Sequence, residues 1–367
     1  MKPTILFILH LPPPVHGAAM MGKYIHDSKL INEAFDCHYI NLTTAKSLQD
    51  IGKGGVRKLW TFFCLLIRII KAVVRLKPAM AYVTPNACGG PFYKDFVVVQ
   101  MLKLLGCKVI VHYHNKGVST RQDKRLDNWL YRHFFKGIKV ILLAEALYKD
   151  VEKYVDRKDV YICPNGIPET AGDTVVPKRD HETPRLLFLS NLLESKGVLV
   201  LLDACRILKD KGYSFVCDFV GGETAEIDAE RFKEEVNKRG LNSITVYNGK
   251  KYGEEKQEFF FNSDIFVSPT SNDCFPLVLL EAMESGLPIV TTEEGGIPDI
   301  VKDGENGLIC ERNNADSVAK SVGFLLNDEE KRKSMGERGY ELFKTNNTLA
   351  AFEQKFAEVI EKANRGG

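Results

Sequence analysis

The sequence contains no uninterrupted run of about 18 apolar residues, so no segment is expected to span a membrane. The apolar run at residues 4–9 is too short for a signal peptide, and a Pro-rich loop follows it directly. The formal net charge is only +2, which gives no overall attraction to nucleic acid. We therefore expect a cytoplasmic protein without a nucleic-acid partner, whose contact with the inner face of the cell membrane, if any, is peripheral.

The nine cysteines include no Cys-x-x-Cys pair, and most of them lie within apolar runs. This scatter is typical of reduced cysteines in the cytoplasm, where they behave as small core residues. The sequence also lacks an Asp-x-Asp pair and any His or Cys cluster with the spacing of metal ligands. We therefore expect no metal and no other cofactor. The Gly-x-Gly-x-x-Gly fingerprint of dinucleotide binding is absent as well.

What the sequence does contain is a regular alternation of short apolar runs, which predict buried strands, and amphipathic segments, which predict helices. Helices are expected, among others, at residues 92–105, 122–135 and 145–154. The alternation is typical of a doubly wound parallel sheet, an α/β fold. A chain of 367 residues is long for one core and suits two domains of roughly 150–200 residues each.

The clearest unit of this pattern lies at residues 263–290. A buried strand at 265–267 is followed by a polar loop at 270–275, a helix between Pro276 and Gly286, and a second buried strand from residue 288. Ligands of parallel sheets bind beyond the carboxyl ends of the strands. The loop acid Asp273 and the helix residue Glu281 are therefore expected to face a binding site.

This stretch resembles the donor-site signature of the retaining GT-B glycosyltransferases of family 4, also called glycosyl transferases group 1. In that family an acid, then seven residues, then Glu marks the nucleotide-sugar site. Here the pair is Asp273 and Glu281, and Asp273 stands where Glu is usual. The resemblance is strong from Arg185 to Cys310 and weaker from Thr4 to Ile167.

The resemblance implies a GT-B fold, in which two Rossmann-like, doubly wound parallel-sheet domains face each other across a cleft. The N-terminal, acceptor-side domain is expected at residues 1–168 and the nucleotide-sugar-binding domain at residues 185–345. The polar segment at 169–184 is the expected linker, after the turn Pro164-Asn165-Gly166. The last helix, at about 346–367, is expected to pack back onto the first domain.

The resemblance also implies the roles of individual residues. Lys196 matches the family's lysine and would oppose the charge of the leaving diphosphate, while Asn191 stands where Arg is commonest. Asp273 suits the hydroxyls of the sugar, and Glu281 suits the ribose. The expected donor-binding residues are Gly17, Asn191, Lys196, Asp273, Cys274, Phe275, Pro276, Leu277, Val278 and Glu281. The expected catalytic residues are His114, Lys196 and Asp273.

The first domain is expected to contribute the acceptor side. Gly17 follows a Pro-rich loop and precedes a helix, where backbone N–H groups can face an anion. The family carries a histidine at the end of the strand that here reads Val-His-Tyr-His, so His114 is the best match. His112, two residues earlier, and His16 are placed on the acceptor side. A buried histidine with a purely structural role remains the alternative.

The segment at residues 56–77 is unusual because its polar side chains form a narrow stripe. The stripe follows spacings of three and four residues, typical of one helix face, and consists of Arg57, Thr61, Cys64, Arg68, Lys71 and Arg75. The remaining surface is a wide apolar arc. One interpretation is a packed domain helix with a solvated stripe, whose basic residues extend along the protein core. The other is a helix that dips into an anionic membrane surface.

These observations predict a retaining glycosyltransferase that moves a sugar from a nucleotide-sugar donor to a glycan or lipid-linked acceptor in cell-surface polysaccharide biosynthesis. A UDP-sugar is the favoured donor and GDP-mannose the second. The alternatives are a nucleotide-sugar 2-epimerase of the same fold and a catalytically silent nucleotide-sugar binding protein. The sequence leaves open whether retention uses a front-face or a covalent route.

Overall fold

The computed structural model describes residues 2–13, 16–43, 56–170 and 182–365, with side chains of residues 56–58 outside the description. The chain forms two compact units. Unit 1 comprises residues 1–166 and 349–367, and unit 2 comprises residues 167–348. Residues 171–181 of the expected linker lie outside the described residues. No described helix is long and apolar enough to cross a membrane.

Unit 1 is built on a six-stranded sheet in the order β2-β1-β3-β4-β5-β6, in which all neighbours are parallel. Its strands are short, and the side chains of the central ones are buried on both faces because helices cover the whole sheet. The strands are β1 (Thr4–Leu9), β2 (Asp36–Asn41), β3 (Met80–Val83), β4 (Val109–His112), β5 (Lys139–Leu142) and β6 (Val160–Ile162).

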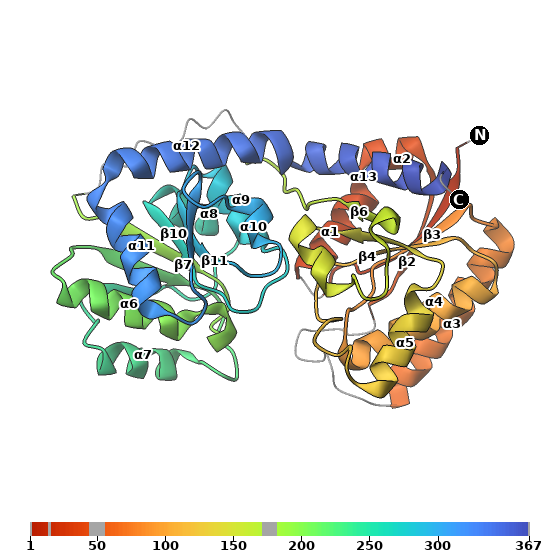
Figure 1. The fold of residues 1–367 in the computed structure, drawn as a ribbon, viewed down its shortest axis with the longest axis horizontal. Coiled ribbons are helices and arrows are strands. Elements are labelled where there is room, and N and C mark those ends of the chain that lie inside the picture. The colour runs from red at the N-terminus through yellow and green to blue at the C-terminus, as the bar shows by residue number, and fades with distance from the viewer. Residues whose placement is uncertain (1, 14–15, 44–55, 171–181, 366–367) are drawn as a thin grey trace. The chain divides into compact units, whose positions relative to one another are not determined.

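Helices cover both faces of this sheet, as the right-hand half of Figure 1 shows. One face carries α1 (Gly17–Asp27), α2 (Lys29–Ala34) and α13 (Leu349–Arg365). The other carries α3 (Val56–Leu76), α4 (Gly89–Leu104) and α5 (Arg125–Phe135). The helix α13 ends the chain, yet its Phe356 ring packs 5.2 Å from Tyr82 and 6.3 Å from Phe7 in the sheet.

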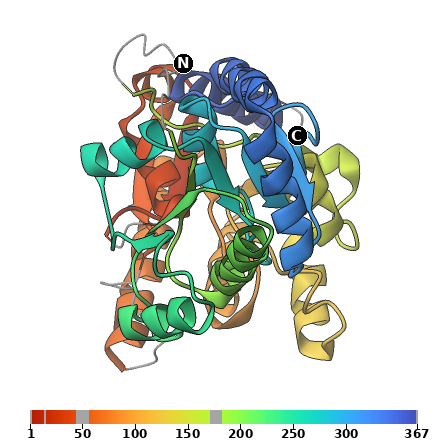
Figure 2. The ribbon, with the colours of Figure 1, turned by 90° about the vertical axis from the view of Figure 1, so that its left-hand side faces the viewer.

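Unit 2 repeats the plan with the order β12-β11-β10-β7-β8-β9, again with parallel neighbours. Its strands are β7 (Arg185–Leu189), β8 (Val216–Val220), β9 (Thr245–Tyr247), β10 (Ile265–Ser268), β11 (Ile289–Thr292) and β12 (Gly307–Cys310). One face of the sheet carries the helices α6 (Val198–Asp210), α7 (Ala229–Lys238) and α11 (Ala315–Asn327). The other face carries α8 (Gly253–Phe261), α9 (Leu277–Glu284), α10 (Ile297–Ile300) and α12 (Glu329–Asn346). Figure 2 shows this unit turned by 90° from the view of Figure 1, with the strands between the helix layers.

The predicted fold class is therefore confirmed as α/β, with two doubly wound parallel sheets. The predicted helix at residues 145–154 is wrong, because the structure has only a 3-10 helix, η2 (Glu145–Asp150), in which Leu147 alone is buried. Without a continuous buried stripe, little stabilises an α-helix there. The sequence interpretation also missed α7 and α8, which bury only two residues and one residue respectively.

Candidate active site

The residues predicted to bind the donor gather at the carboxyl ends of the unit 2 strands. The strand order reverses between β10 and β7, and open α/β sheets bind their ligands at such a reversal. The loop after β7 contains Asn191 and the 3-10 helix η4 (Glu194–Lys196). The loop after β10 contains Asp273 and leads into α9. Both loops therefore start at the position where this fold places a ligand.

Lys196 and Asp273, which sequence reasoning assigned to the same site, are in direct contact. The Lys196 Nζ atom lies 2.5 Å from Oδ2 of Asp273 and donates to the carbonyl of Asn272 at 3.3 Å. The other carboxylate oxygen, Oδ1, accepts the N–H of Cys274 at 3.2 Å. The two side chains are 23% and 20% exposed, so a ligand can reach the pair. Solvent also weakens the attraction between the two charges, so the ion pair can separate.

Backbone contacts fix the positions of the two loops. The carbonyl of Ser195 accepts the N–H of Ser271 at 2.8 Å and the hydroxyl of Thr270 at 3.1 Å. Gly197, at φ +83°, directly follows Lys196, and a Cβ at this position would lie 2.2 Å from the carbonyl oxygen of Pro269. The close approach that places Lys196 beside Asp273 therefore requires glycine at residue 197.

A third loop, after β11, supports the other side of Asp273. The N–H of Gly296 donates to the carbonyl of Cys274 at 2.7 Å. Gly295 has φ +56°, and its Cβ would lie 2.4 Å from the carbonyl oxygen of Asp273. The backbone of Asp273 and Cys274 is thus held from behind, so the Asp273 carboxylate has a defined position before any ligand binds.

The helix α9 begins directly after this loop. Pro276 is its N-cap residue and makes no side-chain capping bond. The N–H groups of a first helical turn have no partners within the helix, so those of Leu277 and Val278 are suited to an anion. Glu281 lies further along α9, and its Oε1 pairs with Nζ of Lys256 at 2.6 Å. Each of these two side chains is 25% exposed.

Asn191 lies beside the glycine turn after β8. Its Oδ1 accepts the N–H of Gly222 at 3.3 Å. A Cβ at Gly222 would lie 3.1 Å from this oxygen and 3.3 Å from Cδ of Lys250, so the three residues are neighbours. Lys250 also lies over the ring of Tyr252, with 5.0 Å between Nζ and the ring centroid. Lys250 therefore places a positive charge close to the uncharged side chain of Asn191.

The predicted acceptor-side residues belong to a histidine cluster in unit 1, which we define as His10, His16, His112 and His114. His10 follows β1, His16 caps α1 through a bond from the N–H of Ala19, and His112 ends β4. The rings of His10 and His16 are 5.9 Å apart, and those of His112 and His114 are 4.2 Å apart. The cluster therefore lies at the carboxyl ends of β1 and β4.

Within this cluster, His112 is the most deeply buried residue, and both ring nitrogens of His114 are buried as well. The side chain of His112 is fully buried, and its Nδ1 lies 2.8 Å from the hydroxyl of Tyr82. It supports His114 from inside the unit. Gly17, the first residue of α1, is exposed, and a Cβ there would meet nothing within 4 Å. No described atom of the protein therefore occupies the space next to the Cα atom of Gly17.

The histidine cluster is electrically neutral near pH 7. Burial lowers the pKa of His114 to about 3, with a smaller contribution from the nearby His16. Burial likewise lowers the pKa of His10 to about 3, assisted by the charges of Lys94, His16 and His114. The pKa values of His16 and His112 are also lowered, mainly by burial. A neutral imidazole has one donor and one acceptor nitrogen, which suits contact with a sugar hydroxyl.

Within the described ranges, no group of three or more His, Cys, Asp or Glu side chains could hold a metal ion. Independence from metal remains a prediction.

The sequence and the fold both match known proteins. The family model described as glycosyl transferases group 1 matches residues 171–342. An uncharacterized glycosyltransferase of Methanocaldococcus jannaschii is 34% identical over 270 residues, which are 72% of this chain and 69% of that protein. The chain belongs to the glycosyl transferases group 1 family.

Other proteins similar to this glycosyltransferase agree with that result. The amylovoran biosynthesis glycosyltransferase AmsK of Erwinia amylovora is 26% identical over 226 residues, 59% of this chain and 55% of that protein. The crystal structure of HepE from Anabaena in complex with UDP matches 98% of this chain and 100% of its own, with a TM-score of 0.76. At 14% identity this likeness shows the fold alone. The predicted family and the predicted GT-B fold are confirmed.

Sequence reasoning did not identify two parts of the site of this glycosyltransferase. Lys256 was not singled out, because it belongs to α8, a helix that the sequence pattern did not predict, and contacts Glu281 only in the folded unit. His10 was treated as a loop residue, although its position directly after β1 was a usable signal. The close approach of Gly295 to Asp273 joins two separate loops, so it could not be foreseen from the sequence.

Proposed function

We propose that this glycosyltransferase transfers a sugar from a nucleotide-sugar donor to a glycan or lipid-linked acceptor during synthesis of a cell-surface polysaccharide. A UDP-sugar is the favoured donor, and GDP-mannose is the second choice. The contact between Lys196 and Asp273, beside the first turn of α9, is the observation that carries the proposal. The name of AmsK refers to polysaccharide biosynthesis and the HepE crystal contains UDP, which supports the substrate classes.

In this proposal, the donor separates the two partners of the ion pair. Lys196 moves from Asp273 to the diphosphate, and the N–H groups of Leu277 and Val278 oppose the same negative charge. Asp273 then accepts hydrogen bonds from hydroxyls of the sugar. Glu281 accepts them from the ribose, since a carboxylate has two oxygens for two neighbouring hydroxyls. Each of these contacts involves a side chain or amide at the carboxyl edge of unit 2.

We propose further that transfer retains the anomeric configuration without a metal. The acceptor oxygen forms a bond to the anomeric carbon, the bond from that carbon to the diphosphate breaks, and the diphosphate takes the acceptor proton. Asp273 already bonds Lys196 and the N–H of Cys274, which suits a binding role better than nucleophilic attack. The neutral His114 would orient a hydroxyl near the reacting carbon.

A thermal-shift screen tests the donor site. We expect stabilisation by one nucleoside diphosphate among UDP, GDP and ADP, no effect of CMP, and no change on adding EDTA. A ligand at one hundred times its Kd stabilises a fold by about 2.7 kcal/mol, which is measurable. The absence of any nucleotide effect would contradict the proposed site, and loss of the effect with EDTA would contradict the metal-free mechanism.

Product analysis separates the proposal from its alternatives. Incubation with the donor alone would yield an epimer if the protein were a 2-epimerase, and unchanged donor if it were a silent binding protein. We expect release of the nucleoside diphosphate that depends on an added acceptor. The anomeric configuration of the product, read by NMR, then tests retention.

A further inference from the structure

The helix α3 has three distinct faces, of which only one packs against its own unit. Leu65, Ile69 and Val73 are buried and form the packed face. A second group of large apolar side chains remains 36–70% exposed, and we call it the α3 face: Leu59, Trp60, Phe63, Ile67, Ile70 and Val74. The third face carries the exposed cations Arg68, Lys71 and Arg75. Core packing therefore uses only part of the apolar arc that the sequence displays.

The α3 face is a continuous stripe rather than a scatter of single residues. Its members are spaced by one, three or four positions, so they lie along one side of the helix. The rings of Trp60 and Phe63 are in contact, with 5.9 Å between centroids, while both remain more than half exposed. Exposed apolar surface of this extent marks an interaction site in most soluble proteins.

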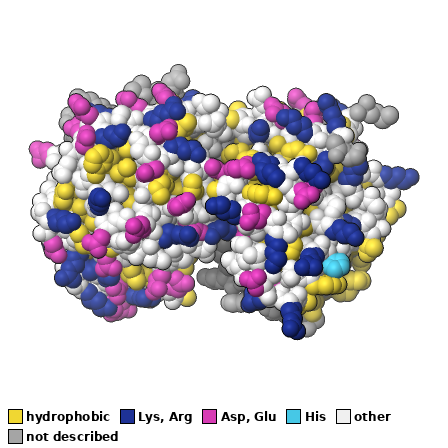
Figure 3. Space-filling view, in the orientation of Figure 1, with side chains coloured by type: hydrophobic (Ala, Val, Ile, Leu, Met, Phe, Trp, Pro, Cys, Tyr) yellow, Lys and Arg dark blue, Asp and Glu magenta, His cyan; other side chains and the backbone are white. Residues whose placement is uncertain are grey.

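The neighbouring helices α4 and α5 also carry exposed apolar side chains. In α5, Leu126 is 61% and Trp129 54% exposed, and in α4, Leu104 is 88% exposed. The only acids in α3, α4 and α5 are Asp95 and Asp127, and both are buried. Every exposed charge on the described side chains of these three helices is therefore positive. Figure 3 shows this part of unit 1 at its lower right, where hydrophobic and basic side chains lie side by side.

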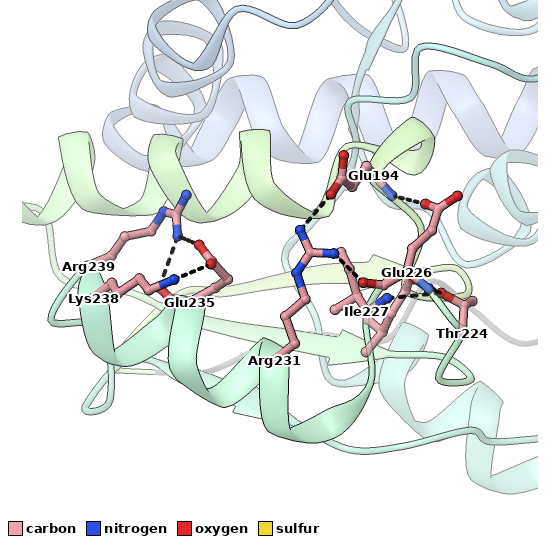
Figure 4. A network of polar contacts seen from close by, with 9 residues as sticks. Glu194, Thr224, Glu226, Ile227, Arg231, Glu235, Lys238 and Arg239 are labelled. Atoms are coloured by element: carbon pink, nitrogen blue, oxygen red, sulfur yellow. Dashed lines mark hydrogen bonds and ion pairs between the residues drawn. The ribbon is translucent and has the colours of Figure 1, made fainter.

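Three basic side chains of α3 that the structure describes also lack acidic partners. Arg68, Lys71 and Arg75 form no ion pair with any residue that the structure describes. The amphipathic helix α7 of unit 2 provides a contrast, shown in Figure 4. There Arg231 pairs with Glu194, and Lys238 and Arg239 both pair with Glu235. Three cations in or directly after α7 are thus neutralised by neighbouring acids, whereas Arg68, Lys71 and Arg75 of α3 are available to an external anion.

We propose that the α3 face docks unit 1 on the surface of an anionic phospholipid bilayer. The apolar side chains of the α3 face, together with Trp129 of α5, would enter the interfacial region of the bilayer. The adjacent cations would contact lipid phosphates. A second copy of the chain fits less well, because its α3 face would bring a second set of unpaired cations against the first. The combination of exposed apolar residues and charge of one sign matches a lipid surface.

The position of this surface is suited to an acceptor that a bilayer carries. In parallel sheets the first turns of the helices lie at the same edge as the carboxyl ends of the strands. Leu59 and Trp60 in α3, and Leu126 and Trp129 in α5, therefore lie toward the edge that holds the histidine cluster. This step rests on the proposed function: a lipid-linked acceptor would reach that edge from the docked membrane.

Vesicle flotation of the full chain, without any nucleotide, tests the docking directly. We expect the protein to float with vesicles that contain phosphatidylglycerol and much less with pure phosphatidylcholine. Leu59→Ser/Trp60→Ser/Phe63→Ser should weaken binding at least about tenfold, and so should Arg68→Gln/Lys71→Gln/Arg75→Gln. The matched control is Phe324→Ser/Lys320→Gln on α11 of unit 2, where both side chains are exposed and binding should not change.

Three results would overturn the inference: no flotation with anionic vesicles, flotation that neither triple variant weakens, or flotation that the control weakens equally. Self-association that the apolar triple variant abolishes, without vesicle binding, would show that a second copy covers the face. Melting temperatures of all variants identify any that unfold. Because this readout needs no donor, it is independent of the nucleotide screen, so failure of one proposal leaves the other standing.

Discussion

At the scale of single residues, charged side chains of the candidate site form ion pairs with each other. Lys196 and Glu281 are each paired, with Asp273 and Lys256 respectively, at 2.5 and 2.6 Å. Partly exposed pairs of this kind stabilise a fold by only about 1 kcal/mol or less. In the proposed function, the two ion pairs keep these charged groups in position until the donor binds.

Glu281→Ala should raise the donor Kd at least about tenfold, a loss of about 1.4 kcal/mol, because the proposed ribose acceptor is removed. Isothermal titration with the nucleotide found in the thermal screen measures this change. Lys256→Met is the matched variant, since it breaks the same ion pair but keeps the carboxylate. It should change affinity much less. Equal losses in both variants would mean that the pair, rather than the Glu281 carboxylate, matters.

The histidine cluster should make unit 1 sensitive to acid. In the folded state the pKa values of His10 and His114 are about 3, whereas an unfolded histidine titrates near 6.5. Between these values the unfolded chain binds more protons, so the free energy of unfolding falls as the pH is lowered below about 6.5. Above that pH the contribution is complete. His114→Gln should therefore flatten the pH dependence between about pH 7 and pH 5 by of order 1 kcal/mol.

Urea unfolding of wild type and His114→Gln at the two pH values provides the measurement. His133→Gln, an exposed histidine of α5, is the control and should leave the slope as in the wild type. An unchanged slope in His114→Gln would show that the ring is not protonated on unfolding in this range.

Several site residues could be predicted from sequence because local patterns position them. A strand, a short loop and a helix together place Asp273 and Glu281, and Lys196 follows a strand in the same way. Contacts between loops are different. Lys256 and Glu281 belong to two helices that a strand separates in the sequence, and they meet only in the folded unit. Gly222 and Lys250 likewise belong to two separate loops. No periodicity in the sequence encodes such distances.

At the scale of elements, prediction succeeded where an element buries a continuous stripe. The helix α5 buries five residues and was predicted at 122–135, within three residues of its bounds, whereas α8 buries only Phe260 and was missed. The helix α3 was predicted as well, but its sequence could not show which part of the apolar arc is packed. That division depends on where the sheet lies, and only the folded unit supplies it.

The element that completes unit 1 is α13. Phe356 is fully buried against Phe7 and Tyr82, and His112 lies 6.3 Å away. Phe356→Ala should destabilise unit 1 by about 3–5 kcal/mol, because it leaves a cavity on the sheet. Hydrogen exchange of the β1 and β3 amides measures this loss within the unit. Phe324→Ala, at a residue that is 48% exposed in unit 2, should leave these amides unchanged.

At the scale of the whole molecule, the two units differ in how the chain builds them. Unit 2 is one continuous segment, residues 167–348, whereas unit 1 consists of two segments. The ends of unit 2 meet, since the N–H of Ile167 donates to the carbonyl of Asn347 at 3.0 Å. Sequence could place strands and helices in each half, but this closure comes from tertiary contacts.

A fragment of residues 167–348 should therefore fold alone and keep the nucleotide affinity of the full chain within about threefold, because it contains its own core and every donor contact proposed for unit 2. Isothermal titration with the same nucleotide measures this. Residues 1–166 alone should fold poorly, and mixing with a peptide of residues 349–367 should restore structure. A fragment 167–348 that folds but binds no nucleotide would place part of the donor site elsewhere.

The contribution of α13 to unit 1 also sets an order of events during protein synthesis. When residue 348 has emerged from the ribosome, unit 2 has all its strands and helices. The sheet of unit 1 still lacks α13, the helix that covers Phe7 and Tyr82. The first segment of unit 1 is made before unit 2, so it must hold an uncovered apolar face until residues 349–365 have been made. Nascent chains should therefore recruit chaperones through the uncovered sheet of unit 1 until α13 has emerged.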